Sequence, residues 1–285
     1  MPELPEVDAT ARLLDRALAG AQIESASAPG INALRTFDPP LTELVGQRIS
    51  RVRRRGKQLI VESSGGLALL IHLMSAGRLQ LYDRPAGRRD RTSRLLVGVR
   101  IEGDGEMELR LREFGSKQAA WVKLMRAESL AEDESLASLG PDAWPDPPPF
   151  GDLLDSPRPL HALLRDQHTI AGIGRSWVDE ILWHAKLSPY KRGADLDEQE
   201  AGRLREATVE TLGAAVAHYE EVLRLPIPDK LPMPLRVHRH EGEPCPRCAS
   251  RLEAVHFEDY VIAYCPACQT EGRVLKDRRL SRLLR

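Results

Sequence analysis

The chain has 285 residues, of which 42% are hydrophobic and 29% are charged, a composition typical of a globular protein with room for two domains. Its formal net charge of −1 argues against a uniformly basic nucleic-acid binder, although phosphate contact depends on local basic clusters. No apolar run is long enough to cross a membrane and no signal-like segment opens the chain, so we expect a cytoplasmic protein.

The first six residues, Met1 to Glu6, predict the start of a helix. Pro5 suits a first helical turn, and apolar residues follow at the spacing of one helical face as far as residue 18. These residues also have a functional interpretation. Removal of Met1 would leave Pro2 as a secondary amine beside the carboxylates of Glu3 and Glu6, which is a nucleophile with acid–base groups within reach. The six residues alone are consistent with both interpretations.

Residues 21 to about 125 contain short strand-like segments separated by turn-rich pieces. The expected strands include 58–62, 67–73, 79–82, 95–101 and 119–124, and residues 102–105 form a hairpin signal. Many short strands with such turns predict a sandwich or a barrel.

Two basic clusters lie in this region, and each is either a phosphate-binding surface or a solvated strand or loop face. The first contains Arg51, Arg53, Arg54, Arg55 and Lys57, and the second contains Arg84, Arg88, Arg89, Arg91 and Arg94.

Residues 140–159 are rich in proline and predict an irregular linker. From about residue 160 to 224 the apolar spacing is helical, with a long amphipathic stretch over 195–225, and prolines between 226 and 234 end it.

Four cysteines form two Cys-x-x-Cys pairs separated by sixteen residues. This spacing predicts a tetrahedral, all-thiolate zinc site that is structural, because four thiolates leave no position open for water. Disulfides are the alternative, and a cytoplasmic location disfavours them. The cysteines are Cys245, Cys248, Cys265 and Cys268, and a basic tail follows with Arg273, Lys276, Arg278, Arg279, Arg282 and Arg285.

Two further motifs fit either nucleic-acid binding or ordinary packing. Gly172 and Gly174 precede an amphipathic helix, so their backbone N–H groups could hold a phosphate, but a helix–turn–helix in a core has the same pattern. Arg112 and Phe114 end a predicted strand, where they could pair with a base edge and wedge a base step. Phe114 could equally be a core residue.

Together, these motifs closely resemble the formamidopyrimidine-DNA glycosylase/endonuclease VIII family over essentially the whole chain. The matching segments are Met1–Val7, Arg55–Lys57, Leu139–Asp142, Asp166–Gln167, Gly172–Gly174, Asp179–Leu182 and the four cysteines, which end in Cys268-Gln269.

The resemblance implies a multidomain α+β fold. A β-sandwich domain with an N-terminal helix would cover residues 1–128, followed by a linker over 129–159. A helix-two-turns-helix DNA-binding domain would cover 160–236, and a zinc-finger hairpin with a basic tail would cover 237–285.

The resemblance also implies the chemistry of a bifunctional DNA glycosylase and abasic-site lyase of base-excision repair. Pro2, freed from Met1, would attack C1′ of the damaged nucleotide and form a Schiff base. Glu3 would be the general acid/base at the sugar, Glu6 would support the site, and Lys57 would act on the sugar-phosphate.

The implied partner is damaged double-stranded DNA, bound by a monomer that carries one structural Zn²⁺ and associates with the nucleoid. The DNA-binding residues would include Arg112 toward the orphan base, Phe114 as a wedge, and the phosphate-binding turn at Gly174 and Arg175.

Several residues depart from the family pattern. Ser75 stands where the family has a wedge methionine, with Met74 one place earlier, and Arg175 replaces an asparagine that binds phosphate. Tyr260, preceded by Glu258 and Asp259, stands where the zinc hairpin carries a phosphate-binding arginine, so we expect DNA contact there to differ.

Residues 223–234 are short and proline-rich and show no counterpart of the loop that covers 8-oxoguanine in the family. We therefore expect weaker excision of oxidised purines than of oxidised pyrimidines or abasic sites. Two other classes of function remain open: a lesion-binding protein with little catalytic activity, suggested by Tyr260 and Ser75, and a zinc-stabilised protein-interaction module, suggested by the neutral net charge.

Overall fold

The computed structural model describes residues 2–30, 32–87, 90–114, 117–258 and 260–276. These residues form two compact units. The N-terminal unit comprises residues 1–138 and 216–232, and the C-terminal unit comprises residues 139–215 and 233–285. The chain first passes between the units at residues 138 and 139, inside the expected linker 129–159, and does so again after residues 215 and 232. The division into four segments stays a prediction.

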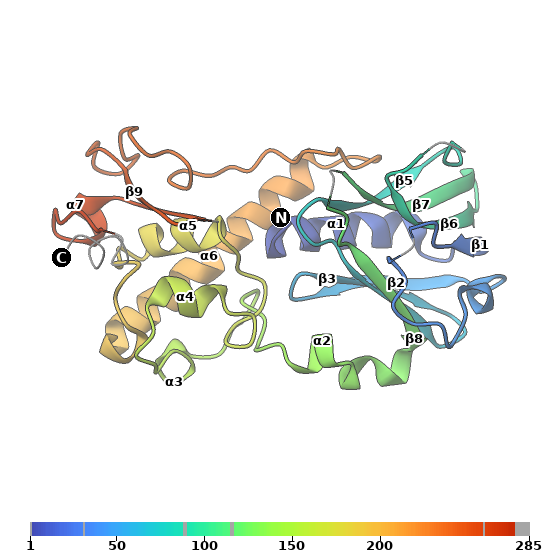
Figure 1. Cartoon of the computed structure of the whole chain (residues 1–285), viewed down its shortest axis with the longest axis horizontal. Coiled ribbons are helices and arrows are strands. Elements are labelled where there is room, and N and C mark those ends of the chain that lie inside the picture. Colours follow the sequence, from blue (N-terminus) through green and yellow to red (C-terminus); the bar gives the residue numbers. More distant parts are fainter. Residues whose placement is uncertain (1, 31, 88–89, 115–116, 259, 277–285) are drawn as a thin grey trace. The chain divides into compact units, whose positions relative to one another are not determined.

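The N-terminal unit is a β-sandwich of two antiparallel, four-stranded sheets, as predicted (Figure 1). One hydrophobic core takes buried residues from both sheets. In the first sheet the order is β1 (Gln22–Ser27), β6 (Ser93–Ile101), β7 (Gly105–Glu113) and β5 (Gly77–Tyr82). In the second sheet the order is β2 (Ile49–Arg55), β3 (Gln58–Ser63), β4 (Leu67–His72) and β8 (Trp121–Arg126).

The hairpin predicted at residues 102–105 joins β6 to β7. Ile101 pairs with Gly105, and Gly103 and Gly105 have φ angles of 92° and 84°, which side chains disfavour. The other strands predicted from the sequence differ from the observed ones by one or two residues at their ends.

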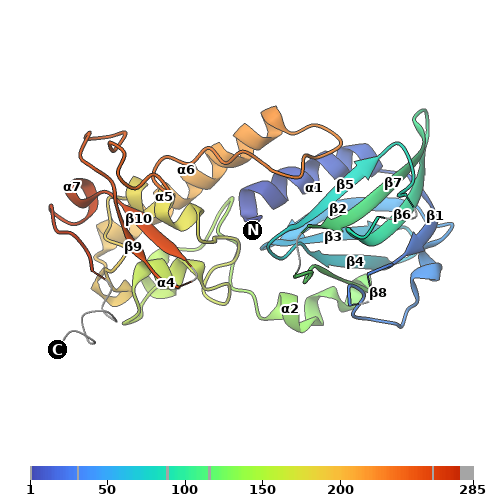
Figure 2. The same ribbon diagram turned by 45° about the horizontal axis from the view of Figure 1, so that its top comes forward.

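Helix α1 (Leu4–Leu18) packs against β2 (Figure 2). Its apolar face is buried in the sandwich core, as the spacing predicted. Two carboxylates attach the polar side to β2. Asp15 accepts the Val52 N–H at 2.6 Å, and Asp8 accepts a hydrogen bond from Arg54 at 2.8 Å. These bonds fix α1, whose first turn follows the predicted nucleophile, against the second sheet.

Short helical turns follow β8. The 3₁₀ turn η2 (Ala127–Glu132) and α2 (Glu134–Ala137) belong to the N-terminal unit, and α3 (Phe150–Leu153) belongs to the C-terminal unit. Helix α3 lies inside the segment 140–159 that the prolines predicted to be irregular. One turn forms there because its four residues lie between prolines rather than on them.

The C-terminal unit contains three more helices before its cysteine-rich segment. These are α4 (Leu160–Arg165), α5 (Trp177–His184) and α6 (Glu198–Val222), with the 3₁₀ turn η3 (Gly193–Asp195) between α5 and α6. The part of α6 from Val216 onward groups with the N-terminal unit. A hairpin of β9 (Glu253–His256) and β10 (Val261–Tyr264) and the short α7 (Pro266–Gln269) follow.

Among the described residues, no helix has both the length and the apolar character that crossing a membrane requires.

Candidate functional site

The start of α1 places Pro2 next to two buried carboxylates. Glu3 and Glu6 each have only 2% of their surface exposed, and Pro2 is buried as well. The Glu3 N–H donates to Glu6 Oε2 at 2.7 Å in a reciprocal capping box, so Glu6 is held in place by the helix terminus itself. The predicted helix start and the predicted nucleophile therefore coexist, because the capping interactions that begin the helix also order the acid–base groups.

Two residues that the sequence did not identify face these carboxylates. Tyr219, from the last turn of α6, is fully buried, and its burial together with Glu6 and then Glu3 raises the pKa of its phenol well above the usual range. Burial lowers the pKa of Arg78 on β5, while Glu6 and Asp229 oppose that shift. Neither residue belongs to a local motif, and each reaches Glu6 only through the tertiary fold.

The turn between β2 and β3 carries Lys57, which is 9% exposed. Burial, followed by the charges of Lys57 and Arg35, lowers the pKa of His72 to about 4, so this imidazole is neutral at physiological pH. His72 Nδ1 accepts the Met74 N–H at 2.9 Å, and the ring stacks on Trp121 with centroids 5.5 Å apart. A neutral imidazole beside an ammonium and a guanidinium suits contact with an anion.

The loop after β4 presents Met74, which is half-buried, and Ser75, which is exposed. Gly77 closes this loop by donating its N–H to the Leu73 carbonyl at 2.8 Å. A Cβ atom at Gly77 would lie 2.4 Å from that same carbonyl oxygen, so the loop requires glycine there.

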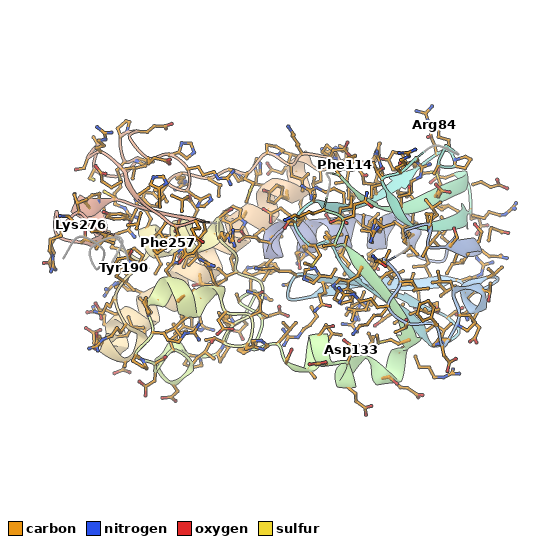
Figure 3. The ribbon with its side chains drawn as sticks, viewed as in Figure 1. Arg84, Phe114, Asp133, Tyr190, Phe257 and Lys276 are labelled. Atoms are coloured by element: carbon orange, nitrogen blue, oxygen red, sulfur yellow. The ribbon has the colours of Figure 1, made fainter. Side chains whose placement is uncertain are left out.

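Arg112 lies near the end of β7, and Phe114 directly follows this strand, as predicted (Figure 3). Arg112 donates to the Tyr82 hydroxyl at 2.8 Å and to the Thr92 hydroxyl at 3.0 Å, and its guanidinium lies 4.6 Å from the Phe114 ring centroid. Asp229 lies 3.7 Å from the same guanidinium. Phe114 is half-buried rather than a core residue.

The basic clusters are partly internal. Arg54 pairs with Asp8, Arg53 lies 2.7 Å from Glu62, and Arg94 is buried against Glu113 at 3.7 Å. These ion pairs engage all three arginines within the unit, and Arg54 and Arg94 are too buried for the solvated face considered from the sequence. Arg88 and Arg89 lie outside the described residues.

In the C-terminal unit, the turn before α5 is held by Gln167. Its side-chain carbonyl accepts the Gly172 N–H at 3.0 Å, and its amide donates to the Ile173 carbonyl at 2.8 Å. Gly172 has a φ of 109°, which explains the glycine at this position. Gly174 is buried and Arg175, the next residue, is exposed.

The buried acidic pair of α5 ties the helix to the cysteine-rich segment. Glu180 accepts three consecutive backbone N–H groups, those of residues 236, 237 and 238, at 2.9–3.0 Å. Asp179 accepts the Ala263 N–H at 3.0 Å and lies 2.7 Å from Nδ1 of His238. These contacts explain why two carboxylates stand on an otherwise apolar helix.

The four cysteines meet in one cluster, with all sulfur atoms within 4.8 Å of one another. Burial raises the pKa of the Cys265 and Cys268 thiols, whereas hydrogen bonds from Ser250 lower the pKa of Cys248 to about 6. Four sulfurs at 2.3 Å from one zinc ion would lie roughly 3.8 Å apart. Two of the observed separations are 3.5 Å, so the cluster has the size of a tetrahedral metal site.

The structure describes two residues of the basic tail. Arg273 pairs with Glu271 at 3.1 Å, and Lys276 is exposed. Arg278, Arg279, Arg282 and Arg285 lie outside the described residues, as does Asp259 beside Tyr260.

Comparison with known proteins identifies the family to which both units are similar. The formamidopyrimidine-DNA glycosylase N-terminal domain matches residues 1–116, and the H2TH domain of the same enzymes matches residues 150–225. The formamidopyrimidine-DNA glycosylase of Thermus thermophilus is 35% identical over 283 residues, spanning 95% of this chain and 100% of the relative. That of Cereibacter sphaeroides is 31% identical over 298 residues, spanning 94% and 100%.

Solved structures of the same family have a similar fold over nearly the whole chain. The Lactococcus lactis Fpg bound to DNA containing N7-benzyl-Fapy-dG superposes with a TM-score of 0.81 at 27% identity, covering 94% of this chain and 100% of the other. The same protein bound non-covalently to DNA with an abasic site superposes with a TM-score of 0.78 at 26% identity, covering 94% of this chain and 99% of the other.

Proposed function

Because the chain belongs to the formamidopyrimidine-DNA glycosylase family, we propose that it is a bifunctional DNA glycosylase and abasic-site lyase of base-excision repair, acting on damaged duplex DNA. The observation that carries this proposal is Pro2, buried beside the ordered carboxylates of Glu3 and Glu6 at the start of α1. We place the protein in the cytoplasm, on the nucleoid, as a monomer.

The chemistry begins once Met1 is removed and Pro2 is a free secondary amine. The Pro2 nitrogen bonds to C1′ as the bond between C1′ and the base breaks, and the base leaves with a proton. Opening of the sugar gives an iminium between Pro2 and C1′. Loss of a C2′ proton then breaks the C3′–O bond and nicks the strand, and water hydrolyses the iminium to restore Pro2.

Each buried group has a role in this sequence. Glu3 moves protons at the sugar, and Glu6 fixes Glu3 through the capping box. Lys57 acts on the sugar-phosphate next to the neutral His72. The positive end of the α1 dipole disfavours a protonated Pro2, which keeps the amine nucleophilic.

Attack at C1′ requires the damaged nucleotide to leave the base stack. Arg112, ordered by Tyr82 and Thr92, would hold the orphan base, and Phe114 would wedge the neighbouring step. Met74 and Ser75 would enter the vacated space from the loop that Gly77 closes.

In the C-terminal unit, Gly174 and Arg175 would bind a backbone phosphate at the start of α5. Cys245, Cys248, Cys265 and Cys268 would hold one structural Zn²⁺, which the mutual distances of their sulfurs support. When bound, the ion neutralises crowded thiolates and fixes the β9–β10 hairpin.

The test is borohydride trapping on duplex DNA with a single abasic site. The zinc-loaded protein with a processed N-terminus should form a covalent complex and nick the strand, Pro2→Gly should abolish trapping, and Glu3→Gln should bind without nicking. A lesion-binding protein with little catalysis is the second candidate, since Tyr260 and Ser75 depart from the family pattern. Tight, salt-sensitive binding without any trapped species would favour it.

Lesion preference is a separate proposal. Within the segment 223–234, Ile227 and Asp229 are held by the first sheet, where Gln80 donates to the Ile227 carbonyl and to Asp229. This segment is too short and too firmly attached to cover an extruded oxidised purine. A panel of duplexes should show weaker excision of 8-oxoguanine than of oxidised pyrimidines, and 8-oxoguanine as the best substrate would refute this.

A further inference from the structure

Tyr260, in the turn between β9 and β10, sits in an unusual cluster of rings and cations. Its ring is parallel to Phe257, with centroids 4.5 Å apart and an interplanar angle of 7°, and it also stacks on His161 at 5.9 Å. The guanidinium carbons of Arg165 and Arg175 lie 4.3 and 5.7 Å from its centroid. One half-buried ring therefore orders two arginines from different segments.

The two arginines come from the two ends, in sequence, of the segment that joins α4 to α5. Arg165 ends α4 and Arg175 follows Gly174. Two guanidinium groups around one ring repel each other, and the cation–π contacts offset this repulsion only in part. An anion bound between them would remove it.

Nearby carboxylates do not supply that anion to Arg165. Asp166, the next residue, pairs with Arg158 at 2.7 Å, and in the part of the chain that the structure describes no carboxylate pairs with Arg165. The Arg165 guanidinium instead contacts the Tyr260 ring.

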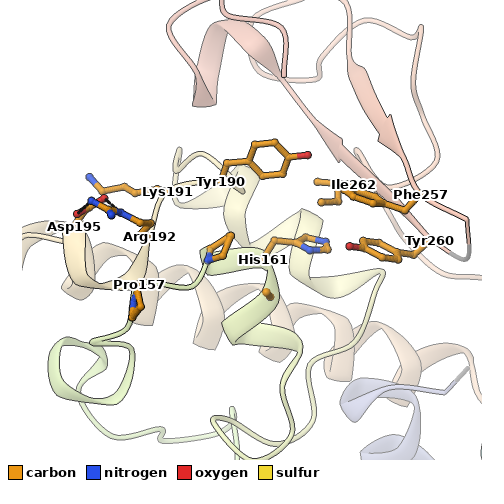
Figure 4. Close-up of a pocket in the computed structure, with 11 residues that line it drawn as sticks. Pro157, His161, Tyr190, Lys191, Arg192, Asp195, Phe257, Tyr260 and Ile262 are labelled. Carbon is orange, nitrogen blue, oxygen red and sulfur yellow. Dashed lines mark hydrogen bonds and ion pairs between the residues drawn. The ribbon is translucent and has the colours of Figure 1, made fainter. Parts of the chain in front are cut away.

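A pocket of about 600 Å³ lies beside this cluster, with His161, Phe257 and Tyr260 on its wall (Figure 4). The cations at its other end are already neutralised, because Lys191 pairs with Glu200 and Arg192 lies 2.8 Å from Asp195. At the Tyr260 end, the Arg165 guanidinium lies over the aromatic ring instead.

We infer that Arg165 and Arg175, ordered by Tyr260, form a clamp for one backbone phosphate of duplex DNA. This inference rests on the proposed function and assigns Arg165 to the DNA interface. Two guanidinium forks can bind one phosphate with several charge-assisted hydrogen bonds. The cation that the zinc hairpin lacks at Tyr260 is then supplied by the helical segment, and the tyrosine contributes by fixing the arginine side chains before DNA arrives.

The test is the salt dependence of binding to a duplex with a non-cleavable abasic analogue, measured by fluorescence anisotropy from about 50 to 200 mM KCl. Arg165→Gln should lower the slope of log K against log salt by roughly 0.9, the value for one lost phosphate contact. Arg203→Gln, at an exposed position of α6, is the matched loss of one charge in the same unit and should leave the slope unchanged.

Variants at Tyr260 test the ordering role. Tyr260→Phe keeps the ring and should bind as the unchanged protein does. Tyr260→Leu should weaken binding about as much as Arg165→Gln, and combining these two should weaken it little further, because both remove the same contact. Zinc content, measured for each variant, shows whether the hairpin is intact.

Equal slopes for Arg165→Gln and Arg203→Gln would overturn the clamp, as would full additivity of Tyr260→Leu and Arg165→Gln. These results are independent of catalysis. If the proposed lyase function fails, borohydride trapping is absent while the binding isotherms remain measurable. If only the clamp is wrong, trapping persists at low salt and the slopes of the variants coincide.

Discussion

His72 should make the N-terminal unit sensitive to mild acid. Its pKa is lowered to about 4 in the folded protein by burial and by the charges of Lys57 and Arg35, whereas an unfolded histidine titrates near 6.5. The unfolded chain therefore binds a proton at a pH where the folded protein does not. Stability from this difference is present above pH 6.5 and is lost as the pH falls toward 4.

The magnitude follows from the two pKa values. One pKa unit corresponds to about 1.4 kcal/mol, so the whole shift of His72 is worth roughly 3 kcal/mol. Between pH 7.5 and pH 5 the unfolded histidine becomes almost fully protonated while His72 stays neutral, which removes about 2 kcal/mol of the unfolding free energy.

The assay compares the original protein with His72→Asn, which cannot titrate, by urea unfolding at pH 7.5 and pH 5. Hydrogen exchange of the β4 and β8 peptides assigns the transition to the N-terminal unit. On going from pH 7.5 to pH 5, the original protein should lose about 2 kcal/mol more of its unfolding free energy than His72→Asn loses. All other titrating groups cancel in this comparison. Equal losses in the two proteins would refute the account of His72 as a neutral, buried base.

Three further predictions concern other parts of the fold. Removing zinc with a chelator should release one ion per chain and change the fluorescence of Trp183, because its indole N–H donates to Cys245 Sγ at 3.3 Å. Strands β4 and β8 should stay protected from hydrogen exchange, and unchanged fluorescence after zinc loss would contradict this prediction. Gly77→Ala should lower the free energy of unfolding, measured in urea, by about 1–3 kcal/mol, because the new Cβ atom would meet the Leu73 carbonyl. Gly87 has open space around it, so Gly87→Ala should leave this free energy almost unchanged. Arg112→Lys keeps the positive charge but loses the planar guanidinium that Tyr82 and Thr92 hold in place. In competitive binding, the discrimination between bases opposite an abasic site should therefore fall by about 1–3 kcal/mol. The control variant Arg100→Lys should preserve this discrimination.

Features with a local cause were predictable from the sequence. The start of α1, the 102–105 hairpin and the cysteine cluster depend on residues close together in the chain, and the structure contains all three. The helical spacing of α5 was also predictable, although its two carboxylates, Asp179 and Glu180, are buried as well.

Features that depend on distant residues were not predictable in this way. Tyr219 and Arg78 approach Glu6 only because α6 and β5 pass the start of α1 in the folded unit. The shift of His72 needs Lys57 and Arg35 beside it. Tyr260 showed from the sequence only that a cation was missing, because the two arginines that surround it belong to other segments.

The central claim is that the Pro2 amine is the nucleophile, and the most direct measurement is the site of the covalent bond. An intact mass should first confirm that Met1 is absent. After borohydride trapping on abasic-site DNA, mass spectrometry of the digested complex should place the reduced sugar adduct on the N-terminal peptide, at the Pro2 nitrogen. An adduct on Lys57 or another lysine, or no adduct from a processed and zinc-loaded protein, would contradict the account.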